Sequence, residues 1–402
     1  MDTTRKGQKW ILDALIAVAG LDVLHPGAAR VMEQLGYDAT DLKRVFEPLK
    51  SGSMAISSWS SVARDIEGRA NHWAARGFQA TAKRMFERAG LLYARTHYSI
   101  HDIELRKRYW RKYVACFDKV AELANHHIER VRLPFEDFHV HGLFETQRGA
   151  RSQPCVILLP GMDMFKEDWH KFMEQRVLPR GWCAFAIDGP GQGESLTHGL
   201  KLSIENFDRA INAVVDWLSK QEAVDPNKIV IMGSSMGSWW ATRAAAAEPR
   251  LKAVAANMSS LGSDKWSAIS VAQPSYMTNL MFMTGINDVE KLETFIGQMT
   301  LEHIAPKVKV PYLIVTGEID ELTTLDATFA TYDALQGPKE AWVYEHDFHP
   351  IGPTSDEWLT ASLDWLDAAL SGALPPALES KVFITKDGEY IEGNGRPRWL
   401  NP

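Results

Sequence analysis

The stretch KIVIMGSSMGSWWATRAAAAEP, residues 228–249, decides the fold. An apolar run at 229–232 ends in Gly233-Ser234-Ser235-Met236-Gly237, and an alanine-rich stretch follows. The apolar run predicts a buried strand and the alanine-rich stretch a helix, so the G-x-S-x-G pentapeptide occupies the sharp turn between them. That turn raises a serine hydroxyl above the sheet edge and leaves the next N–H free to bind an oxyanion. We therefore expect Ser235 to be a nucleophile and the Met236 N–H to be an oxyanion-hole donor.

Similar strand and helix patterns alternate on both sides of this stretch. Apolar runs predict buried strands at 155–160, 183–188, 228–233, 252–259, 312–317 and 341–346. Helical patterns separate most of them, at 168–177, 204–221, 238–248 and 325–335. Continuous apolar strands with helices between them predict an α/β fold with a mostly parallel, doubly wound sheet. We assign this sheet to a catalytic domain over residues 131–375.

Three further segments flank or interrupt that domain. Residues 1–130 show three- and four-residue apolar spacing and predict an all-helical domain, which a hairpin at 131–147 joins to the sheet. Residues 261–309 separate two strands and are rich in methionine and aromatic residues. They predict helices that form either a partial lid over the carboxyl edge of the sheet or a satellite helical pair. The tail, 376–402, contains a predicted hairpin at 381–393 with its turn at Lys386-Asp387-Gly388.

A nucleophilic serine needs a histidine base and a carboxylate that orients it, and this fold uses the order Ser, Asp, His. Asp320 comes just past the strand at 312–317, and we prefer it to Glu318, which is closer to the strand end. His349 comes past the last strand and before a helical pattern, so its loop can reach back over the sheet. His346 more simply ends the strand. The predicted triad is Ser235, Asp320 and His349.

The second oxyanion donor should come from the loop after the first core strand. In LLPGMDMFKEDW, residues 158–169, Gly161 allows close backbone approach and the Met162 N–H is the candidate donor. The glycine-rich loop IDGPGQGES, 187–195, lacks the pattern of a P-loop or a dinucleotide fingerprint, so we interpret it as a turn beside the pocket.

Two histidine pairs raise the question of a metal. His126-His127 and His139-Val140-His141 have no third ligand at a sensible spacing in the sequence. No other motif predicts a cofactor. We therefore expect no metal and no cofactor.

Composition excludes several classes of function. Of the 402 residues, 45% are hydrophobic and 24% charged, as in ordinary globular proteins, and the net charge is −7. No basic run is interleaved with aromatic residues, and no stretch has the length and polarity of a membrane span, so neither a nucleic acid nor a membrane is an expected partner. The N-terminal apolar stretch at 10–24 is interrupted by Asp13 and Asp22, and we interpret it as an amphipathic helix rather than an export signal. Three scattered cysteines predict buried free thiols in a reducing compartment, and we expect a cytoplasmic protein.

The motifs DGPGQGES, PGMDMFKED and GSSMG, with the Asp320 and His349 loops and the preceding helices, resemble the α/β hydrolases with an N-terminal helical cap. That group includes 2,6-dihydropseudooxynicotine hydrolases, fungal polyketide-shortening hydrolases and FrsA-like esterases. The resemblance covers roughly residues 60–370. It assigns the nucleophile, acid and base to the predicted triad, and the oxyanion hole to Met162 and Met236.

The resemblance also implies a helical cap that walls the pocket, a small-molecule substrate and a possible homodimer. It implies cleavage of a carbon–carbon bond next to a ketone in an aromatic or polyketide-like substrate. Such a reaction needs a proton donor near the departing carbon, and the candidates are His349 and, from the predicted lid, Asp264 or Tyr276 as helpers. A carboxylesterase or lactonase would use the same triad, and a non-catalytic small-molecule-binding protein is the alternative of another class. The aromatic and acidic residues that we expect around the pocket are Trp239, Trp266, Asp264, Tyr276 and Phe282.

Overall fold

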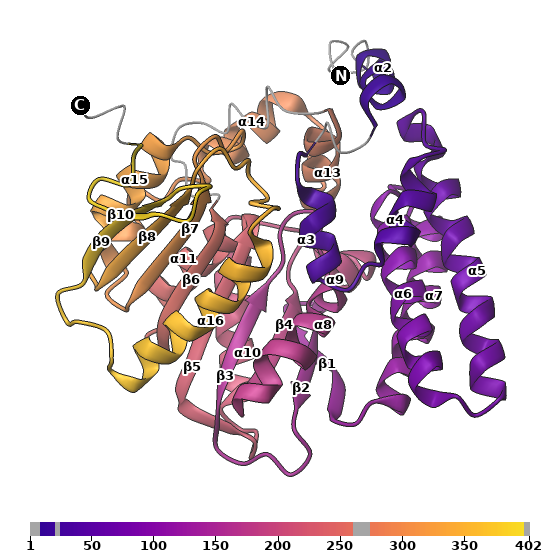
Figure 1. Ribbon diagram of the computed structural model, residues 1–402, viewed down its shortest axis with the longest axis horizontal. Helices are drawn as coiled ribbons and strands as arrows, with labels where there is room; N and C mark the ends of the chain where they lie inside the picture. The colour runs from indigo at the N-terminus through magenta and orange to yellow at the C-terminus, as the bar shows by residue number, and fades with distance from the viewer. Residues whose placement is uncertain (1–8, 21–24, 260–273, 398–402) are drawn as a thin grey trace.

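The computed structural model describes residues 9–20, 25–259 and 274–397 of the chain. Figure 1 shows a bundle of helices, in indigo and purple, beside a twisted sheet with helices on both faces. The helices of this N-terminal part are α2 (Lys9–Ala19), α3 (Ala28–Gln34), α4 (Ala39–Phe46), α5 (Ala55–Ala75), α6 (Gln79–Tyr98) and α7 (Ile103–Leu123), and α3 lies between the bundle and the sheet (Figure 1). The expected helical segment 1–130 thus ends close to the last of these helices. Its independence as a domain stays a prediction.

The described residues form one ten-stranded sheet in the order β1-β2-β4-β3-β5-β6-β7-β8-β9-β10. Its strands are β1 (His127–Phe135), β2 (Phe138–Thr146), β3 (Gln153–Leu159), β4 (Cys183–Asp188), β5 (Val224–Ser235), β6 (Leu251–Ser259), β7 (Tyr312–Gly317), β8 (Lys339–Tyr344), β9 (Glu379–Ile384) and β10 (Tyr390–Glu392). Pairing is parallel from β4 through β3 to β9, and antiparallel at both ends. The mostly parallel sheet predicted from the sequence is confirmed.

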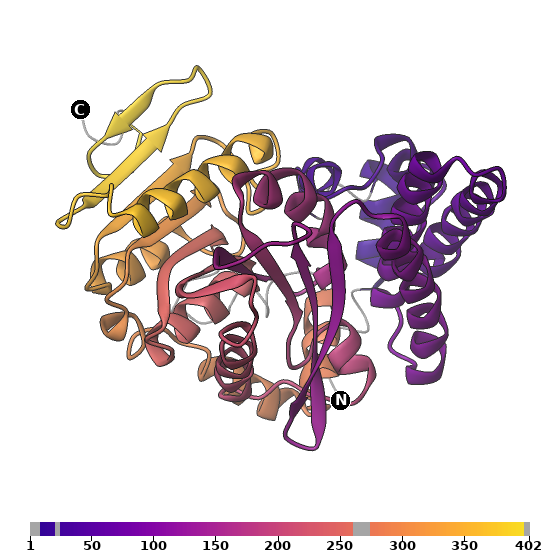
Figure 2. The same cartoon turned by 90° about the horizontal axis from the view of Figure 1, so that it is seen from below.

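The two faces of the sheet carry separate apolar cores. Along β3, Cys155, Ile157 and Leu159 point into one core, and Val156 and Leu158 into the other, because side chains alternate along a strand. The helices α10 (Asn206–Leu218) and α11 (Met236–Ala247) cover the first core, and α16 (Ser355–Ser371) covers the second (Figure 2). Covered on both faces, the central strands can be apolar throughout.

The remaining described helices lie around the carboxyl edge of the sheet or beside its strands. They are α8 (His170–Phe172), α9 (Gly193–Thr197), α13 (Pro274–Thr284), α14 (Val289–Gly297) and α15 (Leu325–Ala334), with short 3-10 or π turns at Gly52–Met54, Lys166–Trp169, Met173–Val177, Leu178–Arg180 and Ala305–Lys307. Of the segment expected as a lid, 261–309, the part from 274 onward is helical as predicted. The tail hairpin adds β9 beside β8 and so extends the sheet.

Two predictions about composition can be compared with the fold. Cys116, Cys155 and Cys183 are buried free thiols, as expected. Among the helices that the structure describes, none combines the length and the apolar character needed to cross a membrane.

Candidate active site

Ser235 lies at the turn between β5 and α11, as the pentapeptide predicts. Its φ of 55° and ψ of −124° are a strained conformation for a residue with a side chain. The residue is only half-buried, although its neighbour Ser234 is fully buried. The strain therefore coincides with the one serine of the pair whose hydroxyl is accessible.

The two glycines of the pentapeptide make this turn sterically possible. A Cβ on Gly233 would lie 2.1 Å from the carbonyl oxygen of Gly237. A Cβ on Gly237 would lie 2.4 Å from the carbonyl oxygen of Leu159. Both clashes are with backbone, which has little freedom to shift, so the helix can start this close to the strand only when both positions are glycine.

His349 and Asp320 meet Ser235 above the carboxyl ends of the strands. His349 Nε2 lies 2.7 Å from Ser235 Oγ, and His349 Nδ1 lies 2.8 Å from Asp320 Oδ2. The other carboxylate oxygen of Asp320 accepts the N–H groups of Leu322 and Thr323 at 2.8 and 2.9 Å. Because Asp320 is fixed by these bonds, it holds the imidazole with Nε2 directed at the hydroxyl.

The pKa of His349 is set largely by acidic neighbours. Burial alone would lower the pKa of His349, but Asp320, followed by Glu321 and Asp163, outweighs burial and raises that pKa above its ordinary value. These acidic neighbours thus favour the protonated form of the ring.

Glu318 and His346, the alternatives to Asp320 and His349, make other contacts. The Glu318 carboxylate accepts the backbone N–H of His346 at 2.8 Å. The His346 side chain is 58% exposed, with Nε2 4.0 Å from the Glu318 carboxylate. The preference for Asp320 and His349 therefore agrees with the geometry.

The loop after β3 brings Gly161 against the nucleophile. A Cβ on Gly161 would lie 3.1 Å from Ser235 Cβ. The Gln192 side chain donates to the carbonyl of Gly161 at 2.9 Å. In a trans peptide the next N–H points the opposite way, so the Met162 N–H is turned away from Gln192. This arrangement suits an oxyanion-hole donor at Met162.

A buried ionic network joins this loop to the glycine-rich loop after β4. The Lys166 Nζ lies 2.9 Å from a carboxylate oxygen of each of Glu167, Asp188 and Glu194. Burial alone would lower the pKa of Lys166, but the three carboxylates raise it well above its usual range. A Cβ on Gly193 would lie 2.2 Å from Asp188 Oδ2, so the first residue of α9 has to be glycine. The motifs PGMDMFKED and DGPGQGES are thus joined into one structural unit.

A second layer of residues behind the triad has no signal in the sequence. His25 Nδ1 donates to Glu321 Oε1 at 2.9 Å, and the other Glu321 oxygen accepts the His349 backbone N–H at 2.8 Å. Although burial alone would raise it, these hydrogen bonds lower the pKa of Glu321 to about 2. His25 Nε2 lies 3.1 Å from the Tyr276 hydroxyl. Because Glu321 is an anion and only accepts, Nδ1 of His25 carries a proton and donates it.

The residues expected around the pocket have different outcomes. Tyr276 is one hydrogen bond from His25, and Phe282 lines a small void of about 10 Å³ together with Met162. Trp239 is fully buried in the apolar core, with its ring 4.5 Å from that of Trp240, and its place in a substrate pocket stays a prediction. Asp264 and Trp266 lie outside the described residues.

The sequence argument against a third metal ligand is corrected. His126 and His170 both bond to Glu145, at 2.8 and 2.7 Å, and the second histidine comes from a distant helix. Burial would lower the pKa of His170, but Glu145 and Glu87 raise it to about 10, so the ring is an imidazolium without a free lone pair. This group ties α6, β2 and α8 together as an ionic cluster.

The sheet order, with helices on both faces and a strained serine turn after the central strand β5, defines an α/β-hydrolase fold. The chain belongs to the prolyl oligopeptidase family, whose model matches residues 172–373, about half of the chain. It is an α/β-fold hydrolase.

Individual relatives agree with this assignment. The chain is 27% identical over 265 residues to 2,6-dihydropseudooxynicotine hydrolase of Paenarthrobacter nicotinovorans, covering 66% of this chain and 70% of that protein. It is 26% identical to hydrolase acrC of Aspergillus aculeatus over 49% of this chain and 51% of that protein, so it spans about half of that relative. The crystal structure of 2,6-dihydroxy-pseudo-oxynicotine hydrolase matches with a TM-score of 0.76 at 22% identity, over 87% of this chain and 98% of that chain.

Proposed function

We propose that the chain is a serine hydrolase that cleaves a carbon–carbon bond next to a ketone, in a small aromatic or polyketide-like molecule, through an acyl-Ser235 intermediate. The observation that carries the proposal is the unbroken line of hydrogen bonds from Ser235 through His349 to Asp320, at 2.7 and 2.8 Å. The similarity to a 2,6-dihydropseudooxynicotine hydrolase supports a small-molecule substrate of that kind.

In the first half-reaction, His349 takes the proton of Ser235 Oγ, and Oγ bonds to the substrate carbonyl carbon. The N–H groups of Met162 and Met236 hold the oxyanion. The carbon–carbon bond then breaks, and the departing carbanion takes the proton from the His349 imidazolium. In the second half-reaction, water gives a proton to His349, and the hydroxide displaces Ser235, which regains its proton. The sum is one ketone and one water giving one carboxylic acid and one protonated fragment.

A carbon leaving group needs stabilisation that an alkoxide does not need. Tyr276 is the residue that we assign to this task, as a hydrogen-bond donor to the enolate oxygen of the leaving fragment. Burial, followed by Asp163, raises the pKa of Tyr276 well above its usual range, so the hydroxyl keeps its proton. Its hydrogen bond to His25, whose ring stacks on that of His349, holds it near the base.

A fluorophosphonate probe tests the nucleophile. We expect the wild-type chain to be labelled covalently and Ser235→Ala to be unlabelled. Ser234→Ala is the matched control, because Ser234 is adjacent but fully buried, and it should label as the wild type does. Labelling that survives in Ser235→Ala contradicts the proposal, and absence of labelling in every variant favours the non-catalytic binder.

Product analysis separates the two enzymatic alternatives. An aryl 1,3-diketone and a nitrophenyl ester of the same acyl group are each incubated with the untreated wild-type chain. Release of both the carboxylic acid and the ketone from the diketone supports carbon–carbon cleavage. Ester turnover with an intact diketone supports the carboxylesterase or lactonase alternative.

A further inference from the structure

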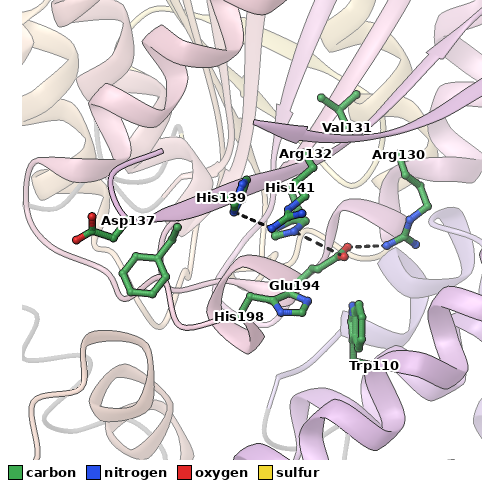
Figure 3. A pocket seen from close by; sticks show the side chains of 11 residues that line it. Trp110, Arg130, Val131, Arg132, Asp137, His139, His141, Glu194 and His198 are labelled. Atoms are coloured by element: carbon green, nitrogen blue, oxygen red, sulfur yellow. Dashed lines mark hydrogen bonds and ion pairs between the residues drawn. The ribbon is translucent and has the colours of Figure 1, made fainter. Parts of the chain in front are cut away.

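A second cavity, of about 600 Å³, lies between helix α7, the β1–β2 hairpin and helix α9 (Figure 3). None of the triad residues lines it. Its wall carries His141 from β2, Glu194 from α9 and His198 from the C-terminal end of α9. Nothing in the proposed hydrolysis uses these side chains.

Ligand atoms of His141, Glu194 and His198 all lie within 4.8 Å of one another. Glu194 and His198 are four residues apart, one helical turn, so their side chains share a face. The rings of His141 and His198 are stacked, with centroids 5.4 Å apart and 29° between planes. Two imidazoles and one carboxylate thus converge on one point of the cavity wall.

The hydrogen bonds of His141 fix its tautomer. The Ser195 hydroxyl donates its single proton to the Asp188 carbonyl, so it can only accept from His141 Nδ1, 3.2 Å away. Nδ1 therefore carries the ring proton. Nε2 lies 3.8 Å from Glu194 Oε1, too far for a hydrogen bond, and two acceptors face each other there. A histidine that donates through one nitrogen and offers the lone pair of the other is arranged as metal-binding histidines are.

Glu194 is oriented in a similar way. Its Oε2 accepts from Arg130 at 2.7 Å and from Lys166 at 2.9 Å. The other carboxylate oxygen, Oε1, faces His141 Nε2. Within the described residues, two buried donors of the same cavity wall, Trp110 Nε1 and Arg130 Nη1, have no hydrogen-bond partner. The edge-on contact of Trp110 with His198, at 4.7 Å between centroids, holds that ring in place.

We propose that His141, Glu194 and His198 bind one divalent ion of the zinc type, with a fourth position open to the cavity. Two histidine nitrogens and one carboxylate oxygen are a known three-ligand set for zinc with an exchangeable fourth ligand. Ligands about 2.0–2.2 Å from a tetrahedral ion are roughly 3.3 Å apart. The pair at 3.8 Å needs only a small side-chain movement to meet that spacing.

The cluster of His126, Glu145 and His170 is a poorer candidate. Each histidine there already shares a hydrogen bond of 2.7–2.8 Å with Glu145. An ion would have to displace both bonds.

The test is a titration of the chelator-treated full chain with Zn²⁺ by calorimetry and with Co²⁺ by visible absorption. We expect one ion per chain and the strong absorption of tetrahedral Co²⁺. His198→Ala should weaken binding at least about tenfold, since loss of supporting residues alone costs about 10–100-fold. His198 is exposed at the rim, so this variant should fold normally.

His139→Ala is the matched control. His139 lines the same cavity, but its ring bonds to Arg132 at 3.1 Å and it is not one of the three ligands. His141→Gln serves as a second ligand variant, and His126→Gln reports on the ionic cluster. The proposal is supported when affinity falls in the His198 and His141 variants alone. It is overturned when no ion binds, when His139→Ala weakens binding equally, or when only His126→Gln does.

Discussion

The imidazole of His25 lies nearly parallel to that of His349, with ring centroids 5.6 Å apart and 21° between their planes. Its two nitrogens hold Glu321 on one side and Tyr276 on the other. A residue from the N-terminal helical part therefore sits directly on the proposed catalytic base. This contact leads to the first prediction.

Tyr276→Phe should lower kcat for an aryl 1,3-diketone by about 10–100-fold, because it removes a donor to the enolate oxygen. Turnover of a nitrophenyl ester should change by less than about threefold, since an alkoxide leaving group does not need that donor. Equal losses on both substrates would mean that Tyr276 has a structural role only.

Glu321→Gln should move the acid limb of kcat/KM to lower pH. The neutral imidazole is the active base, and the Glu321 charge is one of the influences that raise the pKa of His349. Removing that charge lowers this pKa, so the base becomes neutral at a lower pH. A pH profile measured with a nitrophenyl ester gives the shift.

Glu318→Gln is the control for this profile. Glu318 accepts the backbone N–H of His346 and is not among the groups that raise the pKa of His349. Its acid limb should stay in place. An unchanged limb in Glu321→Gln, or a move to higher pH, would refute the assignment.

Gly237→Ala should destabilise the fold by about 2 kcal/mol and abolish fluorophosphonate labelling, because its Cβ meets the Leu159 carbonyl. Gly297→Ala is the comparison: no atom lies within 4 Å of its Cβ, and alanine favours a helix by about 0.5–1 kcal/mol. Denaturant unfolding of both variants gives the two free energies. Comparable stabilities would show that the turn can widen without cost.

Stability should fall at alkaline pH because of His170. Its folded pKa of about 10 lies above the value near 6.5 of an unfolded histidine. The stabilisation is complete below pH 6.5 and is lost as pH rises through about 10. The free energy of unfolding should therefore decline by up to about 1 kcal/mol per pH unit between these values.

His170→Gln should remove most of that decline and also lower stability at pH 7, since it leaves Glu145 and Glu87 without their cation. His72→Gln, at an exposed position on α5, should leave the curve unchanged. Parallel curves for wild type and His170→Gln would contradict the imidazolium assignment.

Local pattern and chain order were enough to predict the sheet and the triad geometry. Ser235, Asp320 and His349 each follow an apolar run, and parallel strands bring their carboxyl ends to one edge. The limits of β4 and β7 agree with the predicted ranges 183–188 and 312–317 because both strands are apolar to their ends. β5 is longer than predicted, since Val224 also pairs with Gln153 across a register shift.

Contacts between distant segments could not be predicted in this way. His25 and Glu321 are 296 residues apart, and neither belongs to a motif. The residues that complete the clusters around His126 and His141 come from α8 and α9, so spacing along the chain does not reveal them.

Ion pairs from helix α6 join the helical part to segments beside the sheet. Lys83 pairs with Glu174 at 2.6 Å, Arg95 with Asp163 at 2.9 Å and Glu87 with His170 at 3.1 Å, all from helix α6. Swinging α6 outward would separate all three pairs at once. Both side chains are buried in the Glu87–His170 pair, and breaking a buried pair costs about 3–5 kcal/mol. These ion pairs thus oppose a movement of the helical part away from the sheet. Differences in substrate preference between this hydrolase and its relatives should therefore follow from the side chains that the helical part presents to the site, and not from how far that part moves.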